Sequence, residues 1–309
     1  MVVWQKVRLK LKSRIGLVTA LAVAFVVLVP GLPLHGHAQA EIPVRFASLD
    51  GSTELTAFLF KPEGQGPFPA VVLLHGCSGL GLGGGVSAIY SAWARVLTKR
   101  GYAALLVDSA GPRGFGETCG RSPARSTLYR DRPKDAYGAL AYLQAHPAIK
   151  ADRIGLLGWS QGGATVLLSV VSESIGRPEP PPHHDFRAAI AFYPGACSET
   201  RQSKPYTRVE LGAWTTQIPL LVLQGEADNW TPSGPCAEFI EAARRRGAPV
   251  EIRLYPDALH GFDAPNLARR ARPWNRTSSG VIPLVGTDPA ARADALQRVP
   301  AFLDRWLKD

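Results

Sequence analysis

Strand-length runs of apolar residues alternate with longer amphipathic stretches through most of this chain. Eight runs are typical of strands, most of them apolar throughout, and they lie at 44–49, 54–60, 70–74, 102–107, 153–157, 188–192, 219–223 and 250–255. The first two alternate polar and apolar positions and are joined by a turn at Asp50-Gly51. Stretches with helical spacing follow at 86–100, 135–145, 164–173, 235–247 and from 288 onwards. This succession predicts an α/β fold with a mostly parallel eight-stranded sheet flanked by helices.

The first 40 residues carry a different pattern, which is typical of a secretory signal peptide. Five basic residues lie between positions 6 and 14, an apolar run extends from 17 to 29, and Ala38-Gln39-Ala40 has the form of a cleavage site. The apolar run is shorter than the roughly 20 residues that span a bilayer, which favours cleavage over an uncleaved membrane anchor. We therefore expect one domain over 41–309, a periplasmic or secreted location, and no stable membrane span after cleavage.

The formal net charge of +10 gives little reason to expect a nucleic-acid partner. Half of it belongs to the five basic residues of the leader, which contains no acidic residue. The remaining basic clusters, such as 244–246, are interpreted as solvated surface because no nucleic-acid-binding motif accompanies them. At most, the residual positive charge favours an anionic substrate.

A serine stands at the turn between one predicted strand and one predicted helix. Gly158-Trp159-Ser160-Gln161-Gly162-Gly163 joins the run 153–157 to the helical stretch 164–173 and contains G-x-S-x-G, the nucleophile elbow of α/β-hydrolases. The turn holds the serine in a strained conformation, and side chains at Gly158 or Gly162 would collide with the neighbouring strand and helix. Ser160 is therefore the candidate nucleophile.

An acid and a histidine follow the serine in the order that the α/β-hydrolase triad requires. Asp228 comes after the run 219–223, and His260 comes after the run 250–255, so both are expected at strand ends. In this hypothesis His260 takes the proton from Ser160 and Asp228 orients the imidazole. Glu226 is the competing candidate for the acid, and Asp257 is a weaker one.

The loop after the run 70–74 is a candidate oxyanion hole. The backbone amide of Cys77, together with that of Gln161, is expected to point at the carbonyl oxygen of a substrate. His75 is interpreted as a structural residue that binds the loop backbone. The glycine-rich stretch that follows is not a phosphate loop, because no Gly-Lys-Ser/Thr accompanies it.

Three residues are candidates for contacts with the substrate. Arg113 lies in a loop after a predicted strand, where it could bind a substrate carboxylate or form a salt bridge that stabilises the loop. Trp159 belongs to the elbow and Tyr193 follows the run 188–192. The segment 198–214 is expected to pass over the top of the sheet. The adjacent His183 and His184 have no third ligand at metal spacing, so they are not interpreted as a metal site. No metal or organic cofactor is expected.

From Phe68 to the C-terminus, the sequence resembles the dienelactone hydrolase family. The motifs that carry the resemblance are 158–163, Gly225-Glu226-Ala227-Asp228, His260-Gly261-Phe262 and the closing helix that begins at Asp288-Pro289. Founding members of that family have a cysteine nucleophile where this chain has Ser160, and a glutamate where it has Gly76. These two departures from the family pattern fit a conventional serine mechanism and leave the dienelactone substrate itself open.

Four cysteines in an exported protein indicate disulfides. In the α/β-hydrolase topology that the resemblance implies, Cys77 and Cys119 follow neighbouring strands, as do Cys197 and Cys236. We therefore expect Cys77–Cys119 and Cys197–Cys236, with four free buried thiols as the alternative.

These observations together favour an exported serine hydrolase that cleaves a small-molecule carboxylic ester or lactone through an acyl-enzyme. A serine peptidase related to prolyl oligopeptidases is one alternative, although about 30 residues before Pro69 cannot form the propeller that such enzymes carry. A non-catalytic binding protein on the same fold is another. Acyl transfer rather than hydrolysis also stays open, since the two differ only in whether water reaches the acyl-enzyme.

Overall fold

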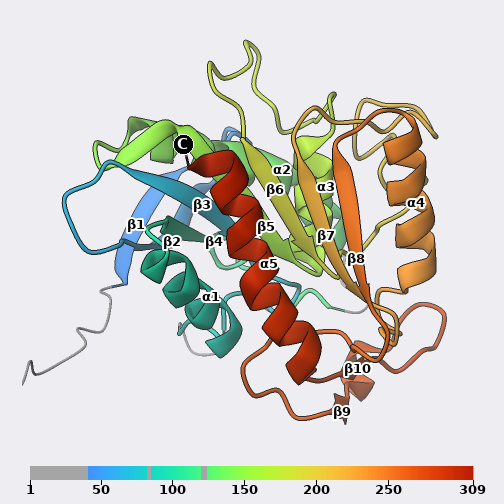
Figure 1. The fold of residues 1–309 in the computed structure, drawn as a ribbon. Coiled ribbons are helices and arrows are strands. Elements are labelled where there is room, and N and C mark those ends of the chain that lie inside the picture. The colour runs from blue at the N-terminus through green and yellow to red at the C-terminus, as the bar shows by residue number, and fades with distance from the viewer. Residues whose placement is uncertain (1–40, 82–84, 120–123, 309) are drawn as a thin grey trace, which may run out of the picture. The chain divides into compact units, whose positions relative to one another are not determined.

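The computed structural model describes residues 41–81, 85–119 and 124–308, so the expected signal peptide lies outside the described residues. Eight strands form one sheet in the order β1-β2-β4-β3-β5-β6-β7-β8 (Figure 1). The strands are β1 (Ile42–Ala47), β2 (Glu54–Phe60), β3 (Phe68–Leu74), β4 (Ala103–Asp108), β5 (Ile149–Trp159), β6 (Ala188–Phe192), β7 (Leu220–Gly225) and β8 (Val250–Tyr255). Only β2 pairs antiparallel, with β1 and β4, and the other pairs within this sheet are parallel. The expected α/β-hydrolase sheet is confirmed.

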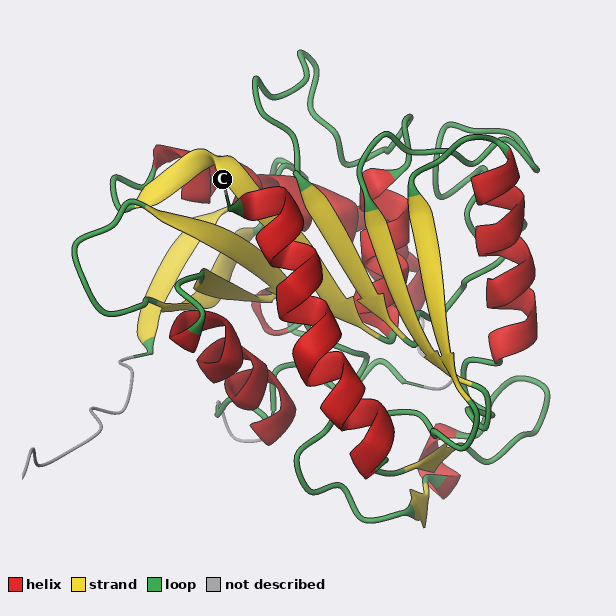
Figure 2. Ribbon diagram, in the orientation of Figure 1, coloured by secondary structure: helices red, strands yellow, loops and turns green. Residues whose placement is uncertain are grey.

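Helices cover both faces of the sheet (Figure 2). They are α1 (Ala88–Lys99), α2 (Ala124–Ala145), α3 (Gln161–Val170), α4 (Ser233–Arg245) and α5 (Pro289–Leu307). Apolar residues of α1 and α5 pack in one cluster on one face, and those of α2, α3 and α4 pack in a second cluster on the other. Strand β6 is buried and apolar throughout, and β3, β4, β7 and residues 154–159 of β5 are buried along almost their whole length, as expected of central strands covered on both faces.

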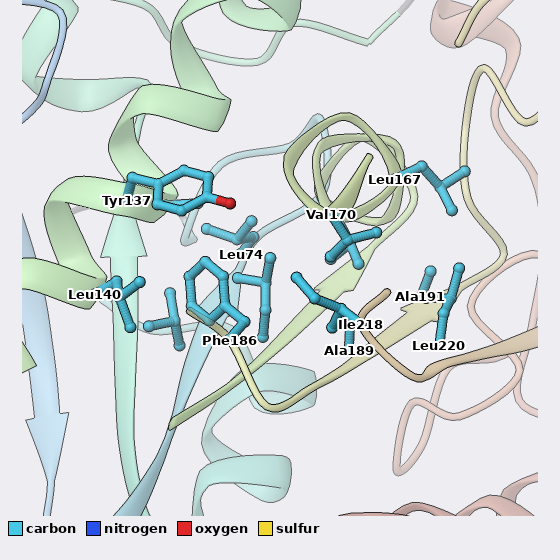
Figure 3. Packing of buried hydrophobic residues seen from close by; sticks show 14 of the residues in the cluster. Leu74, Tyr137, Leu140, Leu167, Val170, Phe186, Ala189, Ala191, Ile218 and Leu220 are labelled. Carbon is cyan, nitrogen blue, oxygen red and sulfur yellow. The ribbon is translucent and has the colours of Figure 1, made fainter. Parts of the chain in front are cut away.

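The second cluster fixes the position of the elbow helix. Figure 3 shows Tyr137 and Leu140 of α2 and Leu167 and Val170 of α3 directed at the same layer of side chains as Leu74 of β3. Each fully buried side chain of this size contributes about 1.5–3 kcal/mol through removal of apolar area from water. Helix α3, whose ten residues are all buried, is therefore held firmly behind the nucleophile.

One helix begins earlier than the sequence predicted, and another begins where it was expected. Helix α2 begins at Ala124 rather than near 135 and continues through Pro133, because the polar stretch before the proline gives no amphipathic signal although Leu128 is buried there. Helix α5 begins after Asp288, as expected, and the Asp288 carboxylate accepts the Ala291 amide at 2.7 Å.

Two further segments lie outside the main sheet. The short strands β9 (Arg270–Ala271) and β10 (Leu284–Val285), which the sequence did not indicate, pair in a hairpin. The segment 198–214 contains turns and no helix or strand. Within the described ranges, no helix has both the length and the apolar character needed to cross a membrane.

The two expected disulfides are present. Cys77 is bonded to Cys119 and Cys197 to Cys236, so the described chain contains no free cysteine. Cys77, Cys119 and Cys197 lie in loops that follow strands β3, β4 and β6, and Cys236 lies in the first turn of α4. The loops after β3, β5, β7 and β8 meet at one edge of the sheet, since the register pairs Leu74 with Gly158 and Gly225 with Tyr255.

Candidate active site

Ser160 occupies the sharp turn between β5 and α3. Its backbone has φ 54° and ψ −111°, which residues with a side chain rarely adopt. The turn is held by hydrogen bonds from the Ser160 amide to the Phe192 carbonyl and from the Gly195 amide to the Ser160 carbonyl, both 2.9 Å. A Cβ at Gly158 would lie 2.3 Å from the Gly162 carbonyl oxygen, and one at Gly162 would lie 2.0 Å from a carbonyl oxygen of β3. Both positions therefore require glycine, as the sequence predicted.

Asp228 and His260 lie together at the ends of β7 and β8. His260 Nδ1 is 2.7 Å from Asp228 Oδ2, and the two residues are 5 % and 3 % exposed. The other carboxylate oxygen accepts the backbone amides of Trp230 at 2.8 Å and Thr231 at 2.9 Å. The Thr231 hydroxyl donates to Oδ2 at 2.7 Å. The carboxylate is thus fixed with one oxygen toward the imidazole, which is the arrangement that orients a general base.

Two aromatic side chains pack against the His260 ring. The ring centroid of Tyr193 lies 4.5 Å from that of His260, and the centroid of Trp230 lies 4.8 Å away. In the part of the chain that the structure describes, no hydrogen bond joins the Ser160 hydroxyl to His260. Such catalytic contacts are often long before a substrate binds.

The two expected oxyanion-hole residues both line the cavity that contains Ser160. Cys77 follows β3, Gln161 opens α3, and neither backbone amide donates a hydrogen bond within the described residues. The Cys77 loop is held by the bond to Cys119 and by the Thr118 amide, which donates to the Cys77 carbonyl at 2.8 Å. A Cβ at Gly76 would lie 3.6 Å from that of Ser160, so the glycine leaves the serine without a neighbouring acid at this position.

Arg113 makes the salt bridge and not the substrate contact. Its guanidinium lies 2.6 Å from an Asp50 carboxylate oxygen and 2.8 Å from one of Asp135, and its side chain is 8 % exposed. Ser109 also presents its carbonyl oxygen to the same guanidinium at 2.8 Å. All these partners belong to the protein, so Arg113 is not offered to a substrate carboxylate.

Trp159 and Tyr193 lie beneath the site and do not line it. Both are almost fully buried, and the Trp159 ring nitrogen and the Tyr193 hydroxyl donate to the Asp263 carboxylate at 2.8 and 2.7 Å. Trp93 is a third donor, at 2.7 Å. Burial raises the pKa of Asp263, and the three donated hydrogen bonds oppose that shift. The expected substrate contacts are therefore corrected to supports of the elbow and of the histidine ring.

His75 has the structural role that the sequence indicated. It is 1 % exposed, and its Nε2 accepts the Ser109 amide at 3.2 Å. Burial, together with the nearby positive charge of Arg132, lowers the pKa of His75 from 6.5 to about 3. The ring is therefore neutral at physiological pH and available as an acceptor.

Two adjoining cavities lie at the candidate site, and Ser160 lines the smaller one. The inner one, of about 200 Å³, is lined by Ser160, Gln161 and Cys77 among others. The outer one, of about 680 Å³, shares Tyr129 and Trp230 with the inner cavity. It also contains Tyr206, Arg125 and Arg201, and no carboxylate lines either cavity within the described ranges. The space can therefore take an elongated molecule with an apolar or negatively charged part.

The described residues contain no cluster of side chains suited to bind a metal ion. No group of three or more histidine, cysteine or acidic side chains gathers there as metal ligands would. His183 and His184 lie in an exposed loop, with their ring nitrogens 3.0 Å apart.

Three residues that contact the candidate site or its supports carried little signal in the sequence. Thr231 stands three residues after Asp228, a spacing at which a hydroxyl and an amide can cap a carboxylate, and this could have been noticed. Asp263 and Arg132 act through contacts with residues far away in the chain, which spacing does not reveal.

Comparison with known proteins agrees with this architecture. A family model described as the dienelactone hydrolase family matches residues 55–307. A relative in Bradyrhizobium sp., a probable 2-oxo-3-(5-oxofuran-2-ylidene)propanoate lactonase, is 28% identical over 231 residues, which are 72% of this chain and 86% of the relative. The dipeptidyl aminopeptidase BIII of Pseudoxanthomonas mexicana is 26% identical over 72% of this chain, but only 36% of the peptidase is matched.

A solved structure shows the same fold. It is a dienelactone hydrolase-like promiscuous phosphotriesterase from metagenomic libraries, with a TM-score of 0.60 and 21% identity. The match covers 86% of this chain and 98% of the other.

Proposed function

Because this chain belongs to the dienelactone hydrolase family, we propose that it is a serine hydrolase that cleaves carboxylic esters or lactones through an acyl-enzyme on Ser160. Family membership makes the chain a carboxylic ester hydrolase. The nucleophile, the base and the substrate are the parts that we propose. The contact of 2.7 Å between His260 and Asp228, at the sheet edge that carries Ser160, is the observation on which the proposal depends most.

Proton transfer begins the reaction. When a substrate fills the inner cavity, His260 Nε2 takes the proton of the Ser160 hydroxyl as Oγ attacks the carbonyl carbon. Asp228 accepts the Nδ1 proton in a hydrogen bond, holds the ring in this tautomer and stabilises the imidazolium that forms. Trp230 and Tyr193 keep the ring from turning away.

The tetrahedral intermediate places a negative charge on the former carbonyl oxygen. The amides of Cys77 and Gln161, which donate to no described residue, can donate to it, and the N-terminus of α3 adds a favourable dipole. The imidazolium then gives its proton to the leaving alcohol, or to the ring-opened alkoxide of a lactone. Water, deprotonated by His260, releases the acid from Ser160 in the second half of the reaction.

The cavities indicate what kind of ester fits. The inner cavity is small, so we propose that it holds the part of the substrate next to the scissile bond. The outer cavity presents Tyr129, Tyr206 and Trp230 and two arginines, which suits a planar or negatively charged distal group. The lactone named for the Bradyrhizobium relative is an anion, which supports the same substrate class here.

Export is the second part of the proposal. We propose cleavage after Ala40 and a periplasmic or secreted single-domain hydrolase over 41–309, because two disulfides are typical of oxidising compartments. N-terminal sequencing of the protein recovered from the producing cell tests the cleavage site.

The proposed function is tested by measuring kcat of the purified wild type and of Ser160→Ala, prepared identically. The substrates are para-nitrophenyl esters of increasing chain length and an aromatic lactone. We expect the variant to lose at least about a thousandfold in kcat while its thermal unfolding is unchanged. Equal inactivity of both proteins toward all these compounds would favour a non-catalytic binding protein. Turnover of aminoacyl anilides in preference to esters would favour a peptidase.

A further inference from the structure

Arg132 is a buried cation that forms no ion pair with any described residue. It lies on α2, is 0 % exposed, and no carboxylate of the described residues is within 4.0 Å of its guanidinium. Asp135, one turn further along the helix, is occupied elsewhere. Its two oxygens accept hydrogen bonds from Arg113, and one of them also accepts the Ser48 hydroxyl.

The guanidinium instead bridges two segments of the candidate oxyanion hole. Nη2 donates to the His75 carbonyl oxygen at 2.7 Å, and Nη1 donates to Gln161 Oε1 at 3.1 Å. His75 begins the loop that carries the Cys77 amide, and Gln161 carries the second amide itself. Thr118 reinforces the bridge, because its hydroxyl donates to Gln161 Oε1 at 3.2 Å and its amide to the Cys77 carbonyl.

Such an arrangement is unfavourable for stability alone. A buried cation loses its hydration, and neutral carbonyl oxygens replace only part of it. Arg132 Nε is buried with no hydrogen-bond partner in the described residues. Burial lowers the pKa of Arg132 to about 10, so the side chain still carries its charge at neutral pH.

We propose that Arg132 is the positioning residue of the oxyanion hole, a role that rests on the proposed function. It fixes the distance between the Cys77 and Gln161 amides by holding the segments that carry them. It also keeps a positive charge behind the place where the negative charge of the intermediate develops. Arg132 itself touches neither the substrate nor the reacting atoms.

This role predicts an effect on the transition state and not on substrate binding. The ester carbonyl is neutral in the ground state and becomes an oxyanion in the intermediate. A misplaced amide pair therefore lowers kcat, whereas KM, which reflects contacts of the whole substrate, changes little.

The experiment compares Arg132→Met and Arg132→Lys with the wild type, using para-nitrophenyl acetate and active sites counted by complete reaction with a fluorophosphonate. Arg177→Met is the matched control, because Arg177 also binds α2, through the Tyr137 hydroxyl at 3.1 Å, but it touches neither oxyanion segment. Trifluoroacetophenone, which forms an oxyanionic adduct with a serine, and acetophenone, which does not, serve as inhibitors.

We expect Arg132→Met to lower kcat per active site about 10- to 100-fold with KM within about threefold of the wild type. Trifluoroacetophenone should lose affinity by the same factor, and acetophenone should not. Arg132→Lys keeps the charge but cannot span both acceptors, so its kcat should lie between that of the wild type and that of Arg132→Met. Arg177→Met should lower the melting temperature and leave kcat per active site unchanged.

A merely structural Arg132 would give a different result. A lower melting temperature with kcat per active site within about twofold of the wild type would overturn the proposal. If Arg132→Met does not fold, Gln161→Met takes its place, because it keeps the backbone amide and removes one end of the bridge. Gln161→Met should also lower kcat. Unchanged kcat in both Gln161→Met and Arg132→Lys would overturn the proposal equally. An inactive wild type would instead refute the proposed function.

Discussion

His260 Nδ1 lies 2.7 Å from Asp228 Oδ2, although the two residues come from different strand ends, 32 positions apart in the sequence. We expect Asp228→Asn to lower kcat about a thousandfold to ten-thousandfold, because the amide would favour the wrong imidazole tautomer and leave the imidazolium unpaired. Steady-state kinetics on a para-nitrophenyl ester measure the change.

Glu226 provides the matched control for this acid. It is exposed, lies two residues before Asp228 in the same loop, and was the competing candidate in the sequence. Glu226→Gln should keep kcat within about twofold of the wild type, as expected of an exposed substitution. A large loss in Glu226→Gln with little loss in Asp228→Asn would reassign the acid.

Arg113 is expected to stabilise the fold and not to bind a substrate. Arg113→Met would leave the buried carboxylates of Asp50 and Asp135 without the cation that they share. The free energy of unfolding should fall by about 3–5 kcal/mol, as for other buried pairs that lose one partner. Urea unfolding measures this, with Arg208→Met as the control, since the exposed pair of Arg208 with Glu179 should contribute only about 0–1 kcal/mol.

Arg113→Met also tests whether Arg113 binds the substrate. KM for an ester with a free carboxylate should be unchanged in Arg113→Met at a temperature where the protein is folded. A KM that rises about tenfold for the anionic ester, and not for a neutral one, would restore Arg113 as a substrate contact.

The lowered pKa of His75 predicts that the stability of the fold depends on pH. Its pKa in the fold is about 3, against 6.5 for an ordinary histidine, so between these values the unfolded chain binds a proton that the folded chain does not. The contribution of His75 is therefore fully present above pH 6.5 and is lost as the pH falls toward 3. Between pH 7 and pH 5 the loss amounts to about 2 kcal/mol.

His75→Gln isolates this contribution, because glutamine can accept the Ser109 amide and does not titrate. Urea unfolding at the two pH values should show a smaller decrease for the variant than for the wild type. Parallel decreases in the two proteins would mean that the His75 ring takes up a proton within the fold over this range.

The Cys77–Cys119 bond is expected to support catalysis as well as stability. The two disulfides close loops of 42 and 39 residues, so removing either one should reduce stability similarly, by about 2–4 kcal/mol. Replacing Cys77 and Cys119 with serine should also lower kcat about tenfold, because the loop with the Cys77 amide loses its anchor. Replacing Cys197 and Cys236 is the control; an equal fall of kcat in both double variants would contradict this role.

The sequence predicted those parts of the site that depend on position along the chain. Ser160, Asp228 and His260 each follow a strand-length run, and parallel strands bring such positions to one edge of the sheet. The glycines of the elbow were predictable from the steric demands of its sharp turn, and the pairing of the cysteines followed from the topology that the family resemblance implies.

Residues whose role depends on distant partners were not predictable. The sequence left a substrate contact and a salt bridge open for Arg113, because its partners Asp50 and Asp135 are 63 and 22 positions away in the chain. Trp159 and Tyr193 are adjacent in sequence to the site, but their polar atoms point to Asp263 below it. Arg132 lies in the polar part of α2 that carried no helical pattern, so neither its helix nor its burial was indicated.

The central claim, that Ser160 is an activated nucleophile, is tested most directly by the mass of the protein after reaction with a fluorophosphonate. The account predicts one phosphonyl adduct per chain, on the peptide that contains Ser160, and no adduct in Ser160→Ala. It also predicts much slower labelling of His260→Ala, because the serine then lacks its base. A wild type that stays unlabelled, or an adduct on another residue, would contradict the account.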